Sequence, residues 1–270
     1  MRDNENEVRK MENDVVLSKV EDGIMSIVLN RPEKLNAINS IMRRRLLNLL
    51  EEARSEPSIR VVLLSGNGKA FCAGADIEGL LAIASTNSLE ERISISDQDP
   101  LIQIGMEIID MDKPVIAMIH GYCLGGGFEI SQYCDMIYAT EDALFGQPEI
   151  NIGILPGGGG SQNLPRMIGV KRAKELIFRG NRISSKEAYS MGALNGIYSS
   201  KEEMFDSVMK IANEIKSKSP AAISASKKAV NASMNMPLAD GLRYERELIR
   251  NLYTSSKVKE FMSGFLNKNK

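Results

Sequence analysis

The stretch that decides the fold is HGYCLGGGFE, residues 120–129, which directly follows the apolar run Val115–Ile119. A short and uninterrupted apolar run predicts a strand that is covered on both faces. The glycines after it predict a sharp turn into a helix. Glycine lets a ligand approach the backbone closely, and the first N–H groups of a helix have no partner within it. The stretch therefore predicts a strand–turn–helix unit whose backbone amides can hold an oxyanion.

A carboxylate accompanies these amides. Glu129 follows Gly126 by three residues, which is less than one helical turn, so both lie on the same side of the predicted helix. A backbone donor and a carboxylate at one site suit chemistry on a carbonyl compound. The alternative is a tight turn with a solvated glutamate, and the local sequence leaves both interpretations open.

The glycine clusters match neither of two common phosphate-binding motifs. The pair Gly68 and Lys69 is followed by Ala70, where a Walker A loop needs Ser or Thr. Ile130 and Gln162 stand where the dinucleotide-binding pattern GxGxxG requires its last glycine. Nucleotide hydrolysis and hydride transfer therefore lose their main support.

Short strands and helices alternate around this unit. An Asp-Gly turn predicts a hairpin, and apolar residues at helical spacing after Ser40 predict a helix with Ser40 as its cap. We expect a flexible extension at 1–13 (Met11 being a possible start), an α/β core at 14–200 and a helical subdomain at 201–270. The other expected elements are hairpin strands at 14–20 and 24–30, a helix at 41–54, strands at 61–64 and 136–139, a mobile loop at 84–100 and a helix at 101–111.

Composition narrows the function classes. The chain has 270 residues, 43% of them hydrophobic and 26% charged, which excludes wholesale disorder. A net charge of −1 argues against a strongly basic nucleic-acid surface. With one histidine, His120, a zinc site of histidines is impossible. Three cysteines without CxxC spacing, and the lack of a signal peptide or long apolar segment, predict a cytoplasmic protein that does not enter a membrane.

Eight segments resemble those of one family in their order along the chain. Residues 70–77, AFCAGADI, and 121–129 resemble the two signature segments of the crotonase (enoyl-CoA hydratase/isomerase) superfamily. The resemblance spans residues 14 to 266. The remaining segments are 30–32, 35–37, 145–149, 156–162, 180–184 and 226–231.

The resemblance implies an α/β fold with a crotonase-type spiral core and a C-terminal all-helical oligomerisation subdomain. It implies an acyl-CoA thioester substrate, a homotrimer or dimer of trimers, and no metal or cofactor, since coenzyme A is part of the substrate. By motif position Ala75 and Gly126 form the oxyanion hole for the thioester oxygen. The substrate- and CoA-binding positions are Ala73, Asp76, Ile77, Gly125 and Gly157, with Gly157 expected to open a helix and to help set the attacking water.

Two glutamates distinguish the hydratase subgroup, and both motif positions are Glu here, Glu129 and Glu149. We therefore expect an enoyl-CoA hydratase in which Glu129 deprotonates water and Glu149 delivers the C2 proton. One alternative is a Δ3-Δ2-enoyl-CoA isomerase or another acyl-CoA enzyme of this fold. A remoter alternative is an RNA-binding relative, for which residues 43–45, all arginine, are the candidate patch.

Overall fold

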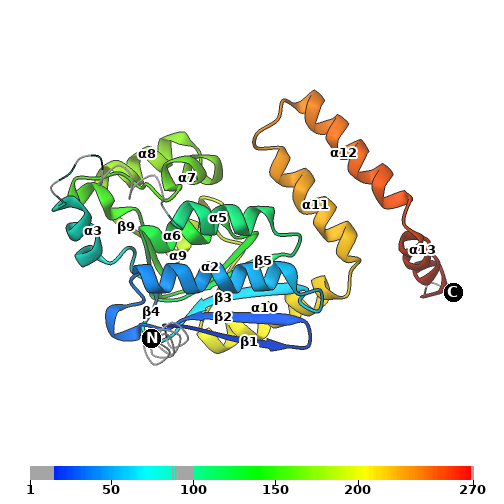
Figure 1. Ribbon diagram of the computed structural model, residues 1–270, viewed down its shortest axis with the longest axis horizontal. Helices are drawn as coiled ribbons and strands as arrows, with labels where there is room; N and C mark the ends of the chain where they lie inside the picture. The colour runs from blue at the N-terminus through cyan, green and yellow to red at the C-terminus, as the bar shows by residue number, and fades with distance from the viewer. Residues whose placement is uncertain (1–14, 87, 89, 91–99, 269–270) are drawn as a thin grey trace.

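The computed structural model describes residues 15–86, 88, 90 and 100–268 and contains two sheets (Figure 1). The predicted extension at 1–13 and most of the predicted loop at 84–100 lie outside these residues. The larger sheet has the order β1 (Val16–Glu21), β2 (Ile24–Leu29), β3 (Val61–Gly66), β5 (Val115–Ile119), β7 (Met136–Thr140), β10 (Gly196–Tyr198). The smaller sheet has the order β4 (Ala70–Cys72), β6 (Tyr122–Leu124), β8 (Leu144–Gly146), β9 (Arg182–Ser184).

The predicted hairpin is confirmed. β1 and β2 pair antiparallel, with Glu21 opposite Ile24. Asp22 and Gly23 between them have φ angles of 46° and 74°, which is the left-handed conformation that a tight hairpin turn needs. All other pairs in the larger sheet are parallel, and the apolar runs of β3 and β5 are buried as their sequence predicts.

The chain builds the core as a spiral. Strands β3, β5 and β7 belong to the larger sheet, and each is followed by a short strand of the smaller sheet, β4, β6 and β8 respectively. Helices then return the chain to the larger sheet after β4 and β6, whereas after β8 the chain first forms β9 of the smaller sheet and then returns to β10. This is the α/β architecture that the sequence predicts, and it stacks β4, β6 and β8 as parallel neighbours.

Helices cover both sheets. One predicted cap is wrong: Asn39, rather than Ser40, caps α2, because its side chain accepts a hydrogen bond from Met42 N at 2.9 Å. Within α2 the three arginines do not form one exposed patch, since Arg44 is exposed while Arg43 and Arg45 are half-buried. The bounds are η1 (Pro32–Lys34), α2 (Ser40–Ser55), α3 (Ile77–Ala84), α5 (Pro100–Asp110), α6 (Gly126–Tyr133), η2 (Pro148–Ile152), α7 (Gly160–Ile168), α8 (Val170–Arg179), α9 (Ser185–Ser190) and α10 (Lys201–Lys216).

Three further helices extend away from the core: α11 (Pro220–Ala232), α12 (Leu238–Tyr253) and α13 (Ser256–Lys268), drawn orange to dark red in Figure 1. In contrast, α10 packs on the larger sheet and buries Met204, Val208 and Ala212 in a second apolar cluster. The chain therefore leaves the core after Lys216, later than the boundary expected at residue 201. No helix in the described part of the chain is long and apolar enough to span a membrane.

A buried ion pair fastens α11 to the core. Lys227 Nζ lies 2.8 Å from Asp135 Oδ2 and also donates to the carbonyls of Ile108 and Lys113. Asp135 Oδ2 accepts a second hydrogen bond, from Val115 N at 2.8 Å. Burial raises the pKa of Asp135, and the Lys227 ammonium opposes that shift. Loss of Lys227 would therefore leave a buried carboxylate without its counter-ion.

We expect Lys227→Met to lower the free energy of unfolding by about 3 kcal/mol, because removing one partner of a buried pair leaves the other uncompensated. Urea denaturation measures the loss. The adjacent Lys228→Met is the matched control, since Lys228 pairs with Asp112 where both side chains are about half exposed, and such pairs contribute about 0–1 kcal/mol. Equal losses of unfolding free energy in the two variants would contradict the role of the Lys227–Asp135 pair in fastening α11.

Candidate active site

Three loops meet at one edge of the smaller sheet. Because β4, β6 and β8 are parallel neighbours, their carboxyl ends lie at the same edge, which is where open α/β sheets bind ligands. The segments that follow these ends are 73–76, 125–129 and 147–149. Residues that are far apart in the sequence are thereby brought together, among them the candidates Ala75, Gly126, Glu129 and Glu149.

Two backbone amides lie side by side here. A Cβ built on Gly126 would lie 3.6 Å from Ala75 N, so the two backbone segments are in contact distance of each other. Gly126 is the first residue of α6, and its N-cap Gly125 has a φ of 49°, which favours glycine. Among the described residues, the hydrogen bonds of loops and caps include none in which Ala75 N or Gly126 N donates. The two amides are therefore the candidate donors for an oxyanion.

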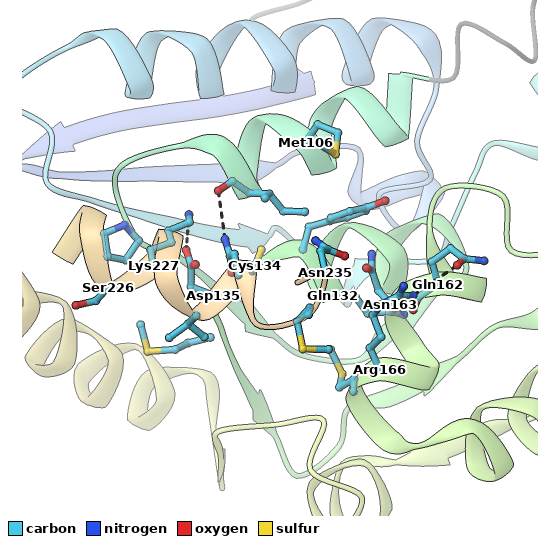
Figure 2. Close-up of a pocket in the computed structure, with 18 of the residues that line it drawn as sticks. Met106, Gln132, Cys134, Asp135, Gln162, Asn163, Arg166, Ser226, Lys227 and Asn235 are labelled. Carbon is cyan, nitrogen blue, oxygen red and sulfur yellow. Dashed lines mark hydrogen bonds and ion pairs between the residues drawn. The ribbon is translucent and has the colours of Figure 1, made fainter. Parts of the chain in front are cut away.

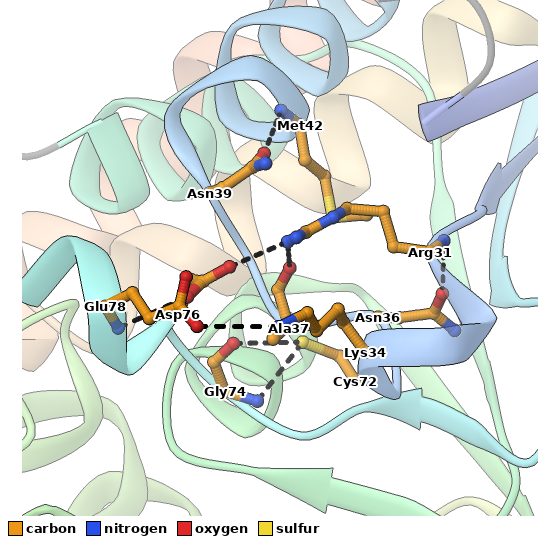
Figure 3. Close-up of polar contacts among 10 residues, drawn as sticks. All are labelled: Arg31, Lys34, Asn36, Ala37, Asn39, Met42, Cys72, Gly74, Asp76 and Glu78. Atoms are coloured by element: carbon orange, nitrogen blue, oxygen red, sulfur yellow. Dashed lines mark hydrogen bonds and ion pairs between the residues drawn. The ribbon is translucent and has the colours of Figure 1, made fainter.

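Main-chain and side-chain contacts hold the loop that contains Ala75, and Figure 3 shows the pairing of Arg31 with Asp76. Ile38 N donates to Gly74 O at 2.8 Å, and Asp76 N donates to Ile38 O at 3.0 Å. Arg31 Nη1 lies 3.0 Å from Asp76 Oδ2, with both side chains largely buried. The Asp76 carboxylate thus anchors the loop and, by accepting from Glu78 N, caps α3.

Glu129 is held among glycines. It is only 2% exposed, and its Oε1 accepts a hydrogen bond from Gly160 N, the first residue of α7, at 2.9 Å. A Cβ built on Gly158 would lie 2.7 Å from Glu129 Oε2, which is closer than atoms can pack. Glycine is therefore required where the α7 turn approaches this carboxylate.

Glu149 lies beside the N-cap of α6. A Cβ built on Gly125 would lie 2.7 Å from Glu149 Oε1, so the carboxylate packs directly against the cap of α6. Burial raises the pKa of Glu149 to about 7, and a hydrogen bond from its own backbone opposes the shift. A carboxyl group with this pKa can both release and accept a proton near neutral pH.

The other sequence-predicted positions have different surroundings. Ala73 N donates to Leu35 O at 2.9 Å, and Ile77 opens α3 with its side chain 63% exposed. The expectation that Gly157 opens a helix is wrong, because Gly157 lies exposed in a turn and α7 begins at Gly160. His120 directly follows β5, and its Nε2 contacts Gly68 O at 3.0 Å.

The sequence interpretation missed three contributors. Gly160 was one of four equivalent glycines, and only its contact with Glu129 distinguishes it. Arg31 lies in the resembling segment 30–32, but its role follows only from its pairing with Asp76. Gln147 is fully buried, and when its amide is oriented with the nitrogen toward Glu149, that nitrogen lies 3.2 Å from both carboxylate oxygens. The sequence signal for this contact was the position of polar Gln147 two residues before the candidate acid Glu149.

Comparison with known sequences agrees with this geometry. The sequence model of the enoyl-CoA hydratase/isomerase family matches residues 19–270. The chain belongs to the enoyl-CoA hydratase/isomerase family.

Individual relatives match over nearly the whole chain. A short-chain-enoyl-CoA hydratase of Clostridium acetobutylicum is 35% identical over 260 residues, which cover 96% of both chains. A mitochondrial enoyl-CoA hydratase of Pongo abelii is 36% identical over 244 residues, covering 90% of this chain and 81% of the relative. The crystal structure of an enoyl-CoA hydratase from Bacillus anthracis superposes with a TM-score of 0.86 at 33% identity, covering 94% of this chain and 96% of that one.

Proposed function

We propose that this protein is an enoyl-CoA hydratase that adds water reversibly, and syn, across the C2=C3 bond of a trans-2-enoyl-CoA. The observation that carries the proposal is the placement of two carboxylates, Glu129 and Glu149, around one pair of backbone amides. Relatives named as enoyl-CoA hydratases at 35–36% identity support it.

The amide pair stabilises the intermediate. Ala75 N and Gly126 N donate to the thioester oxygen, which gains negative charge as the substrate becomes an enolate. Because the charge develops only during the reaction, fixed donors bind the transition state more strongly than the ground state. The positive end of α6 adds to this preference, since Gly126 is its first residue.

The two glutamates move the protons. Glu129 takes a proton from the water that attacks C3, and Glu149 gives its proton to C2. The pair therefore holds one proton before and after the reaction, although the proton has changed its carboxylate. Dehydration runs the same steps backwards from the same number of protons. The raised pKa of Glu149 suits it to carry that proton at neutral pH.

Coenzyme A binding is the second part of the proposal. The carbonyls of Ala73 and Ile77 are proposed to contact its adenine, and the backbone at Asp76, Gly125 and Gly157 to line the thioester end. These steps use no metal ion or redox cofactor. Among the described residues no three His, Cys, Asp or Glu side chains gather as a metal site would need.

Self-association is the third part. The helix α12 buries none of its residues within the chain and exposes Leu238, Leu242, Ile249 and Tyr253. Large apolar side chains gathered on one element indicate a protein contact. We propose that α11–α13 join copies of the chain into a homotrimer or a dimer of trimers, and sedimentation equilibrium measures the mass against 29.8 kDa per chain.

The activity is tested with crotonyl-CoA. The purified protein should deplete the absorbance of the conjugated enoyl thioester, and in H₂¹⁸O the product should carry one ¹⁸O at C3. Isomerisation of a 3-enoyl-CoA would leave the product free of solvent oxygen, so mass spectrometry separates the two reactions. A lack of hydration with both short and long enoyl-CoAs would overturn the proposal.

A further inference from the structure

The amide of Gln147 joins Glu149 to a second glutamine, Gln132 on α6. A side-chain amide is oriented by the partners at its two ends, and one orientation satisfies both ends of Gln147. Its oxygen then accepts from Gln132 Nε2 at 2.9 Å, and its nitrogen donates to both oxygens of Glu149 at 3.2 Å. In the reverse orientation, amide N–H groups would face each other at Gln132 and a carbonyl would face the Glu149 carboxylate.

We propose that Gln132 is a positioning residue for Glu149: by donating to the Gln147 carbonyl, it keeps the Gln147 amino group turned toward the Glu149 carboxylate. This inference deepens the proposed function and rests on it, because it assumes that Glu149 is the group that transfers the C2 proton. Gln132 itself touches no reacting atom.

The chain of two amides affects the charge of Glu149. A donor that faces a carboxylate stabilises its ionised form, whereas burial stabilises the neutral form. The other carboxylate of the site is Glu129, and charged side chains occur on three elements packed beside η2 and β8. These are Lys171, Arg172, Lys174, Glu175 and Arg179 on α8, Arg182 on β9, and Lys186 and Glu187 on α9, and none of them contributes to the pKa shift of Glu149. Within the described residues, Gln147 is thus the side chain that can hold the Glu149 pKa down.

Gln132 can be substituted because its side chain lies beside a cavity (Figure 2). It lies on the wall of a cavity of about 780 Å³ between α5, α6, α7 and α11, and it is 8% exposed. Its Oε1 has no hydrogen-bond partner among the described residues, so the Gln147 contact is the bond that defines its amide. Gln162 lines the same cavity but bonds to Ser161 and Arg166 on α7. It is therefore a matched control.

The first test is Gln132→Met, which keeps the length of the side chain and removes the donor. The Gln147 amide is then free to turn, and we expect the pKa of Glu149 to rise by about half to one unit. The alkaline limb of kcat/KM for crotonyl-CoA hydration should move to higher pH by the same amount. Gln162→Met should leave the limb where it is in the unmodified protein.

Two further variants separate positioning from packing. Gln132→Glu replaces a donor by an acceptor, so the Gln147 amide should reverse and the pKa of Glu149 should rise further than in Gln132→Met. In a Gln147→Met background, Gln132→Met should add no shift, since the residue through which it acts is gone. The inference is overturned if the pKa of Glu149 in Gln132→Met is unchanged, whatever the melting temperature of that variant. It is also overturned if Gln132→Met shifts the Glu149 pKa by the full amount in the Gln147→Met background. If Gln132→Met does not fold, the Glu149 pKa in Gln132→Glu is measured instead, and an unchanged value overturns the inference.

A measurement without turnover distinguishes this inference from the proposed function. Protein labelled with [δ-¹³C]glutamate is titrated by NMR, and the Glu149 signal is assigned by its absence in Glu149→Gln. If the protein does not hydrate crotonyl-CoA, the proposed function is refuted. A rise of the Glu149 pKa in Gln132→Met would even then support the role of Gln132 in positioning the Gln147 amide. Normal hydration together with an unmoved Glu149 titration refutes the role of Gln132 alone.

Discussion

Replacing Glu149 by Gln is expected to lower kcat for crotonyl-CoA hydration by about 10²- to 10⁴-fold, the usual loss on removing a general acid. Glutamine keeps the size of the side chain and its contact with Gly125, but it has no proton to give to C2. Glu129→Gln should reduce kcat to a similar degree, because the attacking water then has no base. Stopped-flow or steady-state loss of enoyl-thioester absorbance measures both effects.

The two losses should not add. Each proton transfer depends on the other, so the double variant is expected to be about as slow as the slower single variant. Glu175→Gln serves as the matched control, because Glu175 is exposed and pairs only with Arg179 one turn away. Its activity should equal that of the unmodified protein. A Glu149→Gln protein that keeps most of its kcat would show that Glu149 is not the acid.

The pH dependence follows from the proton count. Activity in either direction needs one proton on the Glu129–Glu149 pair, and burial raises the pKa of Glu149 to about 7. Deprotonation above that pKa leaves no acid, so kcat/KM should fall about tenfold per pH unit in the alkaline range. Hydration and dehydration should fall together, because no proton enters their equilibrium. In Glu149→Gln the residual rate should lack this limb.

Local patterns were sufficient for most of the fold. The strands β3 and β5 are apolar runs, and the hairpin follows from an Asp-Gly turn, so short stretches carry the necessary information. The cap of α2 was misplaced by one residue because Asn39 and Ser40 both suit an N-cap, and only the contact with Met42 N decides between them. The position of α10 was also misjudged, since an amphipathic pattern shows that one face is buried but does not show against what.

The candidate site was predictable only where residues near in sequence act together. Gly126 and Glu129 share one helix, so their proximity follows from helical geometry. Gly160 contacts Glu129 across 31 positions, and a run of four glycines does not reveal which of them makes that contact. The chain from Gln132 through Gln147 to Glu149 depends on how α6 packs beside η2. Such contacts are set by the tertiary structure rather than by spacing.

The oxyanion hole offers the second large effect, through Ala75→Pro. Proline has no N–H, so the thioester oxygen loses one of its two donors, and kcat is expected to fall about 10²- to 10³-fold. The bridge to Ile38 uses Gly74 O and Asp76 N, and neither bond involves Ala75 N. The substitution therefore removes a catalytic donor without removing a bond of the fold. KM should change much less than kcat, because the enolate oxygen is charged only near the transition state.

Ala75→Gly is the matched control for this donor. Glycine keeps the N–H and removes only a methyl group, so its kcat should stay within a few-fold of the unmodified protein, as small changes away from the reacting atoms usually do. Circular dichroism and the unfolding midpoint report whether Ala75→Pro keeps the fold. A folded Ala75→Pro protein with nearly full kcat would exclude this amide from the oxyanion hole. A loss in Ala75→Pro that Ala75→Gly does not share would assign the effect to the N–H, which glycine keeps and proline lacks.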